Sequence, residues 1–180
     1  MLKIGITGGI GSGKSTVCEI FKQLNIPVYS ADDRAKRLMV ENQELVHAIK
    51  NLFGEEAYDA NGALNRSYIA ERAFSDASLL EKLNQLVHPA VAKDFLNWAQ
   101  EQSAPYVIKE AALMFESGSF RDLDYVVTVS APKALRIRRT MQRDGSSKAQ
   151  VEARMNKQWT EAMRKASADF IIRNDEEHAL

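Results

Sequence analysis

One segment near the start of the chain combines glycines, a lysine and hydroxyls in an arrangement that binds nucleotide phosphates. Residues 8–15 read Gly-Gly-Ile-Gly-Ser-Gly-Lys-Ser, which satisfies the pattern G-x-x-x-x-G-K-[ST]. Glycines permit backbone dihedral angles that are closed to other residues, so successive N–H groups can face phosphate oxygens. We expect Lys14 to neutralise the β- and γ-phosphates of ATP and the Ser15 hydroxyl to ligate Mg²⁺. The predicted nucleotide contacts are Gly9, Ile10, Gly11, Ser12, Gly13, Lys14, Ser15 and Thr16.

The segments on either side of this loop are the ones that a phosphate site requires. Residues 2–7 read as a buried strand, and residues 14–24 read as a helix with its apolar residues on one face. Residues 26–30 read as a second strand, so the three segments form a βαβ unit with parallel strands. A chance glycine-rich turn is the alternative interpretation, and it would not require this context. The helix N-terminus adds its unpaired N–H groups to the anion site.

A phosphate loop alone does not distinguish a switch protein, a mechanical ATPase and a kinase. A GTPase switch needs N-K-x-D, whereas the nearest match, at residues 156–159, lacks the acidic residue. A D-x-x-G match at residues 59–62 is a turn with no strand before it. A mechanical ATPase or helicase would normally need a longer chain. A small-molecule kinase also needs a carboxylate near the γ-phosphate, cations on the transferring group and a closing substrate domain.

Asp32 is the candidate carboxylate. It lies just past the second predicted strand, at the carboxyl edge of the sheet, where open α/β sheets bind ligands. There it can accept a proton from an attacking hydroxyl or orient that hydroxyl. The alternative is that Asp32 or Asp33 caps a helix that begins at Arg34. Both roles are compatible if Asp33 is the cap and Asp32 faces the site.

Three arginines are the candidate cations. Arg136, Arg139 and Arg143 form a stripe beside the apolar face of a helix that starts at Pro132. The polar turn at residues 144–147 follows, so this helix suits a lid that lays guanidinium groups on ATP phosphates. The alternative is an ordinary solvated basic face.

Two glutamates are weaker candidates. Glu110 ends the third predicted strand, where a carboxylate can hold Mg²⁺ through water. Glu116 follows an apolar run and can be either a helix-start acid or a substrate contact. Structural roles are equally open for both residues.

The rest of the chain reads as an α/β core with a helical insertion. Helices are expected at about 33–39, 43–53, 66–74, 77–87 and 89–102, with no linker that would make this part independent. The core resumes with strands at 106–108, 125–129 and 170–173. Helices are expected from Pro132 to about Arg143 and from about 148 to 166.

Composition excludes several classes of protein. Lys+Arg and Asp+Glu both total 24 in 180 residues, so the basic excess that is typical of nucleic-acid binding is absent. The single cysteine, Cys18, fits a reducing cytosol. The N-terminus reads as neither a signal peptide nor a transit peptide. No stretch approaches the roughly 20 apolar residues that cross a bilayer. We therefore expect a cytoplasmic protein without nucleic-acid or membrane partners.

The ordered motifs resemble those of the dephospho-CoA kinase family over nearly the whole chain. They lie at residues 7–15, 31–32, 88–89, 113–116, 139–144 and 168–172. The resemblance implies transfer of the ATP γ-phosphate to the ribose 3′-hydroxyl of dephospho-CoA. It also implies a P-loop NTPase-type parallel five-stranded sheet, a helical CoA domain and a lid. Asp32 falls on the family's base, and Arg139 and Arg143 fall on its lid arginines.

The expected boundaries follow from this resemblance. The core covers about 1–32 and 104–180, the CoA-binding insertion about 33–103 and the lid about 136–160. The chain departs from the family at residues 110–114, where Glu-Ala-Ala-Leu-Met replaces a frequent Asp-x-Pro-Leu-Leu. The remaining alternatives are another P-loop kinase, acting on a nucleoside or nucleoside monophosphate, and a non-catalytic nucleotide-binding protein.

Overall fold

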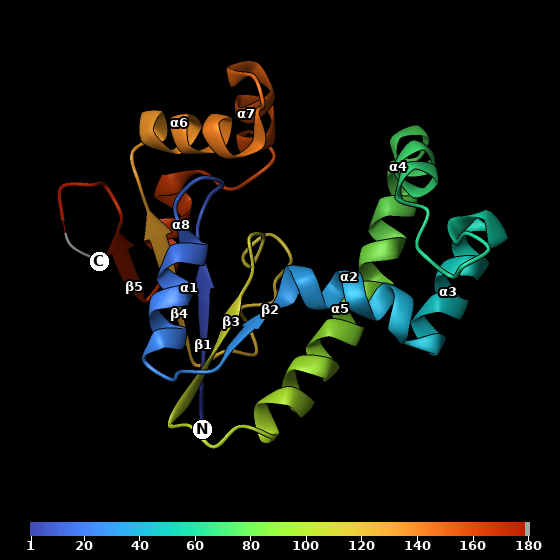
Figure 1. The fold of residues 1–180 in the computed structure, drawn as a ribbon, viewed down its shortest axis with the longest axis horizontal. Coiled ribbons are helices and arrows are strands. Elements are labelled where there is room, and N and C mark those ends of the chain that lie inside the picture. Colours follow the sequence, from blue (N-terminus) through green and yellow to red (C-terminus); the bar gives the residue numbers. More distant parts are fainter. Residues whose placement is uncertain (179–180) are drawn as a thin grey trace. The chain divides into compact units, whose positions relative to one another are not determined.

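The computed structural model describes residues 1–178, except for the side chains of Phe74 and Ala77. The chain forms two compact units (Figure 1). One comprises Met1–Ser30 with Glu101–Leu180, and the other is Ala31–Gln100.

A five-stranded sheet forms the centre of the first unit. Its strands are β1 (Leu2–Thr7), β2 (Val28–Ser30), β3 (Tyr106–Glu110), β4 (Tyr125–Ser130) and β5 (Phe170–Arg173). Their spatial order is β2-β3-β1-β4-β5, and every neighbouring pair is parallel. The expected parallel five-stranded sheet is therefore confirmed. Because all strands run the same way, their carboxyl ends meet at one edge, which is also where the phosphate loop leaves β1.

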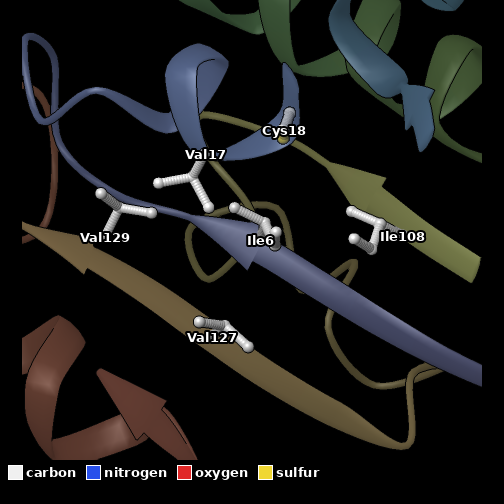
Figure 2. Packing of buried hydrophobic residues seen from close by; sticks show 6 residues of the cluster. All are labelled: Ile6, Val17, Cys18, Ile108, Val127 and Val129. Carbon is white, nitrogen blue, oxygen red and sulfur yellow. The ribbon is translucent and has the colours of Figure 1, made fainter. Parts of the chain in front are cut away.

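Helix α1 (Lys14–Gln23) covers one face of this sheet. Its Val17 and Cys18 pack on Ile6 of β1, Ile108 of β3 and Val129 of β4 (Figure 2). Burial of these apolar side chains fixes the helix on the sheet and so fixes where its N-terminus lies. The start of α1 is consequently held at the carboxyl end of β1.

Three helices lie in the C-terminal part of this unit, where the expectation of one helix over 148–166 is wrong. They are α6 (Lys133–Asp144), α7 (Lys148–Met155) and α8 (Glu161–Ser167). Residues 156–160 separate α7 from α8, and the Thr160 side chain caps α8 by accepting a hydrogen bond from the Met163 N–H. The break lets residues 158 and 159 make contacts that a continuous helix would not allow.

The second unit is helical and contains α2 (Ala31–Glu41), α3 (Gln43–Phe53), the 3₁₀ turn η1 (Glu55–Ala57), α4 (Arg66–Ser75) and α5 (Ala77–Gln100). The expected break before Pro89 is wrong, because α5 runs through it. The proline removes one backbone donor, but Val87, Val91, Phe95 and Ala99 continue one buried stripe at four-residue spacing across it. Packing along that stripe outweighs the lost hydrogen bond.

The helical unit contains a partly buried ion pair, and none of the described helices could cross a membrane. Arg34 of α2 makes a bidentate ion pair with Asp94 of α5, at 2.8 and 2.6 Å, which ties these helices together. Within residues 1–178, no helix is sufficiently long and apolar to span a membrane.

Candidate active site

The phosphate loop has the backbone geometry that its glycines permit. Gly11 and Gly13 have φ angles of 76° and 92°, in the region that favours glycine. The Ser12 N–H donates to the Gly9 carbonyl at 3.0 Å, which closes a turn inside the loop. Gly13 then caps the start of α1, so the loop passes directly into a helix N-terminus. This is the arrangement expected of an anion site.

Lys14 and Glu110 lie next to each other at the carboxyl edge of the sheet. The Lys14 ammonium donates to the Gly8 carbonyl at 3.2 Å and lies 3.9 Å from a Glu110 carboxylate oxygen. The other carboxylate oxygen of Glu110 accepts a hydrogen bond from the Ser30 hydroxyl at 3.4 Å. Ser15 is exposed one residue after Lys14. A hydroxyl and a carboxylate are oxygen donors of the kind that Mg²⁺ prefers, so this donor set fits the ion.

Arg139 is held beside the loop through Asn174, the residue after β5. The Asn174 side-chain NH₂ donates to the buried Ser12 carbonyl at 2.9 Å. Arg139 donates to the Asn174 backbone carbonyl at 3.0 Å and to its side-chain oxygen at 3.2 Å. A Cβ added to Gly13 would lie 2.0 Å from the Asn174 nitrogen, which shows how closely this side chain approaches the loop. Arg139 and the phosphate loop are therefore brought together.

Four residues hold the loop from its outer side: Arg136, Gln158, Glu161 and Arg164, here called the outer clamp. Arg136 Nε donates to the Ile10 carbonyl at 3.0 Å, and the Ile10 N–H donates to the Gln158 side-chain oxygen at 2.9 Å. One Glu161 oxygen accepts from both Arg136 and Arg164, each at 3.2 Å. Desolvation lowers the pKa of Arg136, while Glu161 opposes the shift. The Ile10 N–H therefore faces the clamp in this structure.

Glu116 connects this part of the chain to the loop after β3. It accepts a hydrogen bond from the Trp159 backbone N–H at 2.7 Å. The Trp159 ring stacks on Phe115 with centroids 5.2 Å apart and an interplanar angle of 9°. Trp159 in turn accepts a hydrogen bond from Arg164 through its backbone carbonyl. Glu116 thus fixes the segment that carries Gln158.

Arg143 is placed differently from Arg139. Its guanidinium binds the neighbouring Asp144 at 2.7 Å, and Arg154 of α7 binds the same carboxylate at 2.8 Å. These two guanidinium groups lower the pKa of Asp144 to about 2. The Arg143 side chain is 60% exposed. Arg143 would have to leave Asp144 to reach a phosphate group.

Asp32 is exposed in the first turn of α2. The helix begins at Ala31, three residues before the expected Arg34, so neither Asp32 nor Asp33 is its N-cap. Both carboxylates lie in the first turn, where the positive end of the helix dipole stabilises negative charge. Asp33 is paired with Lys36 at 2.7 Å. Asp32 follows Ser30, the last residue of β2, by two positions.

Sequence reasoning missed Asn174 and the role of Gln158. Asn174 directly follows the last strand, at the carboxyl edge of the sheet where ligands bind. The same position singled out Asp32, so it could have identified Asn174 as well. Gln158 lies in the rejected N-K-x-D match, and its side chain reaches the loop only because α7 and α8 are separate. The local signal for that break is Thr160, an N-cap residue type followed by Glu161 in the first turn of α8.

Comparisons with known proteins identify relatives of this chain. A family model described as dephospho-CoA kinase matches residues 2–179. The chain is 42% identical to a dephospho-CoA kinase of Porphyromonas gingivalis, covering 100% of this chain and 89% of that protein. It is 41% identical to one of Salinibacter ruber, covering 97% and 89%.

Two solved structures are similar to this chain. The crystal structure of TT1252 from Thermus thermophilus has a TM-score of 0.85 and 36% identity, covering 96% of this chain and 88% of that one. A dephospho-CoA kinase from Campylobacter jejuni has a TM-score of 0.71 and 29% identity, with the same coverage of 96% and 88%.

Proposed function

Because this chain belongs to the dephospho-CoA kinase family, we propose that it transfers the γ-phosphoryl group of ATP to the ribose 3′-hydroxyl of dephospho-CoA. The new bond joins the 3′-oxygen to the γ-phosphorus, and the bond from that phosphorus to the β–γ bridging oxygen breaks. The products are CoA and ADP, and the hydroxyl proton passes to a base. The observation that carries the proposal is the phosphate loop with Lys14 beside Glu110, in a chain that matches this family from residue 2 to 179.

The residues of the loop supply most of the electrostatic work. Backbone N–H groups and Lys14 stabilise charge on the β- and γ-phosphates. We assign Ser15 as a direct ligand of Mg²⁺ and Glu110 as a partner through water, consistent with its position next to Lys14. When bound, Mg²⁺ neutralises phosphate charge. A carboxylate that contacts the ion through water tolerates the extra methylene of Glu relative to the family's Asp.

We assign Asp32 as the base that accepts the 3′-hydroxyl proton. A general base typically accelerates such a step about a hundredfold to ten-thousandfold. Its place directly after β2 supports the assignment, because β2 ends at the ligand-binding edge of the sheet.

Arg139 and Arg143 are the proposed cations for the transferring phosphoryl group, on a lid at about residues 136–160. Arg139 already lies beside the loop through Asn174. Arg143 exchanges Asp144 for a phosphate oxygen when the part of the lid around Gly145 closes, while Arg136 and Gln158, near the two ends of the lid, stay on the loop. Its exposure and the Gly145 turn, with a φ of 64° and open space around it, support that movement.

The helical unit is the proposed binding site for dephospho-CoA. It contains a cavity of about 380 Å³ between α2, α3 and α5, lined by both apolar and polar side chains such as Leu38, Leu45, Asn42 and Lys93. Such mixed lining suits an elongated ligand with amide groups. We place the reaction in the cytoplasm, in keeping with the single, buried Cys18.

An acceptor panel tests the proposal. The protein is incubated with Mg-ATP and dephospho-CoA, AMP, uridine or no acceptor, and ADP release is measured. Of these acceptors, we expect only dephospho-CoA to give fast ADP release, and its product should carry one additional phosphoryl group. An analogue that lacks the 3′-hydroxyl is the matched control and should give only the rate without acceptor. Preferential turnover of AMP or uridine would overturn the assignment in favour of a nucleotide or nucleoside kinase.

A further inference from the structure

We propose that Arg136 is a positioning residue for the phosphate loop, and that the outer clamp sets the affinity for the ATP phosphates by fixing Ile10 from outside. This inference rests on the proposed function only in that the loop is taken to bind ATP. The role of Arg136 differs from the lid roles of Arg139 and Arg143. Arg136 contacts the backbone of the loop, whereas Arg139 and Arg143 are proposed to contact the transferring phosphoryl group.

The contacts of the clamp restrain two successive peptide planes. The Ile10 N–H belongs to the plane shared with Gly9, and it donates to Gln158. The Ile10 carbonyl belongs to the plane shared with Gly11, and it accepts from Arg136. Holding both planes fixes the tip of the loop before any ligand arrives. With the Ile10 peptide planes held by the clamp, the other N–H groups of the loop need less reorganisation when phosphate binds.

Buried charges make this restraint stiff. The Arg136 and Arg164 side chains are 7% and 2% exposed, and both bind the same Glu161 oxygen. A planar guanidinium offers several donors in a fixed geometry, so Arg136 can bind Ile10 and Glu161 at once. The Glu161 carboxylate is surrounded by these two guanidinium groups and by the Lys165 ammonium at 3.9 Å, so positive charge exceeds negative charge behind the loop, and the low exposure of both arginines preserves its effect on phosphate.

Gly9 supplies independent evidence for close packing of the clamp. Unlike Gly11 and Gly13, it does not have a positive φ, so its backbone does not require glycine. A Cβ at this position would nevertheless lie 2.1 Å from Arg136 Nη2 and 2.6 Å from Arg164 Nη2. The phosphate-loop pattern leaves this position open. The two guanidinium groups give a reason for the glycine that the pattern does not.

Space beside the clamp makes the proposal testable by substitution. A cavity of about 320 Å³ adjoins Arg136 and Glu161 at the ends of β4 and β5, and it is lined by polar groups that include Lys165 and Arg173. A shorter side chain at position 136 can therefore be compensated by water from this cavity.

The test compares Arg136→Met with Arg138→Met, a matched change on the same helix at an exposed arginine paired with Glu176. Calorimetry measures the Kd for ADP and ATP, and steady-state kinetics measures KM for each substrate. We expect Arg136→Met to weaken both nucleotides about tenfold or more, the range of a lost charge-assisted hydrogen bond. KM for dephospho-CoA should stay within about twofold.

Arg136→Lys should be intermediate, because one ammonium cannot reproduce the guanidinium fork. Arg138→Met should behave as the parent.

A lower Tm with unchanged nucleotide affinity in Arg136→Met would overturn the proposal and leave Arg136 a purely structural residue. If Arg136→Met does not fold, Gln158→Leu removes the acceptor of the Ile10 N–H without touching a charge. It should weaken ADP severalfold, and unchanged ADP affinity there would equally overturn the proposal. The ADP measurement needs no acceptor. If the acceptor panel showed that this chain phosphorylates AMP and not dephospho-CoA, the proposed function would be refuted. The ADP affinities of the variants would still decide the role of Arg136.

Discussion

The substitution Gly9→Ala examines how tightly the outer clamp packs on the phosphate loop. The new methyl carbon would lie 2.1 Å from Arg136 Nη2, whereas ordinary contacts begin near 3.4 Å. The guanidinium therefore has to move by about 1.3 Å, as the difference between these two distances. That movement cannot preserve both the 3.0 Å hydrogen bond to the Ile10 carbonyl and the 3.2 Å contact with Glu161.

Three effects determine the size of the destabilisation. Overpacking typically costs about 1–3 kcal/mol. Loss of a hydrogen bond to a charged group typically costs about 1.5–3 kcal/mol. The reduced entropy of the unfolded chain opposes them, but contributes only about 0.4–1 kcal/mol. We expect Gly9→Ala to lower the free energy of unfolding by about 3 kcal/mol, which for a chain of this size lowers Tm by about 10 °C.

Thermal and urea unfolding without ligand measure this change. Gly145→Ala is the control, because Gly145 has a φ of 64° with open space around it. Alanine there should lower the free energy of unfolding only by the cost of the left-handed backbone, about 1–2 kcal/mol. Combining Gly9→Ala with Arg136→Met removes the closer of the two clashes and leaves only the one with Arg164 Nη2 at 2.6 Å, so the two changes should be partly non-additive. Additive effects, or a loss no larger than that of Gly145→Ala, would refute the reasoning.

Four further substitutions separate binding from chemistry at the site. Lys14→Ala should abolish the rise in Tm that Mg-ATP produces, and a normal rise would remove Lys14 from the phosphate site. Asp32→Asn should bind ATP and dephospho-CoA normally by calorimetry, yet turn over at least about a hundredfold more slowly. Turnover within about threefold of the parent would instead make Asp32 a helix-start residue. Arg139→Ala and Arg143→Ala should each lower kcat more than about tenfold, as expected for contacts with the transferring group. Arg139→Ala should also weaken ATP, because it releases Asn174 from the loop, and equal ATP affinity in the two variants would contradict that difference.

The parts of the fold that local patterns control were predictable. The phosphate loop, α1 and the strands at residues 2–7 and 170–173 depend on glycine placement and on short apolar runs, which the sequence displays directly. Helix α3 was also located by its periodicity and by the glycine that ends it, Gly54.

Errors arose where tertiary packing overrides local preference. Pro89 is a strong signal for a helix start, yet the stripe from Val87 to Ala99 keeps α5 continuous. Residues 156–160 show no glycine or proline, yet stacking of Trp159 on Phe115 and the Thr160 cap separate α7 from α8. Contacts between residues more than 100 positions apart, such as Arg136 with Ile10, leave no periodic trace in the sequence.

The stacked pair of Phe115 and Trp159 also gives the chain an intrinsic fluorescent reporter. The sequence contains two tryptophans, and the other, Trp98, lies on α5 in the helical unit, where it stacks on Phe95. Trp98→Phe would leave Trp159 as the sole tryptophan, which can be excited selectively over the five tyrosines. Its ring touches the loop after β3, and its backbone is bonded to Glu116 and to Arg164 of the clamp. Its emission spectrum and quenching would then follow the surroundings of the phosphate loop during nucleotide binding, in real time and without a chemical label.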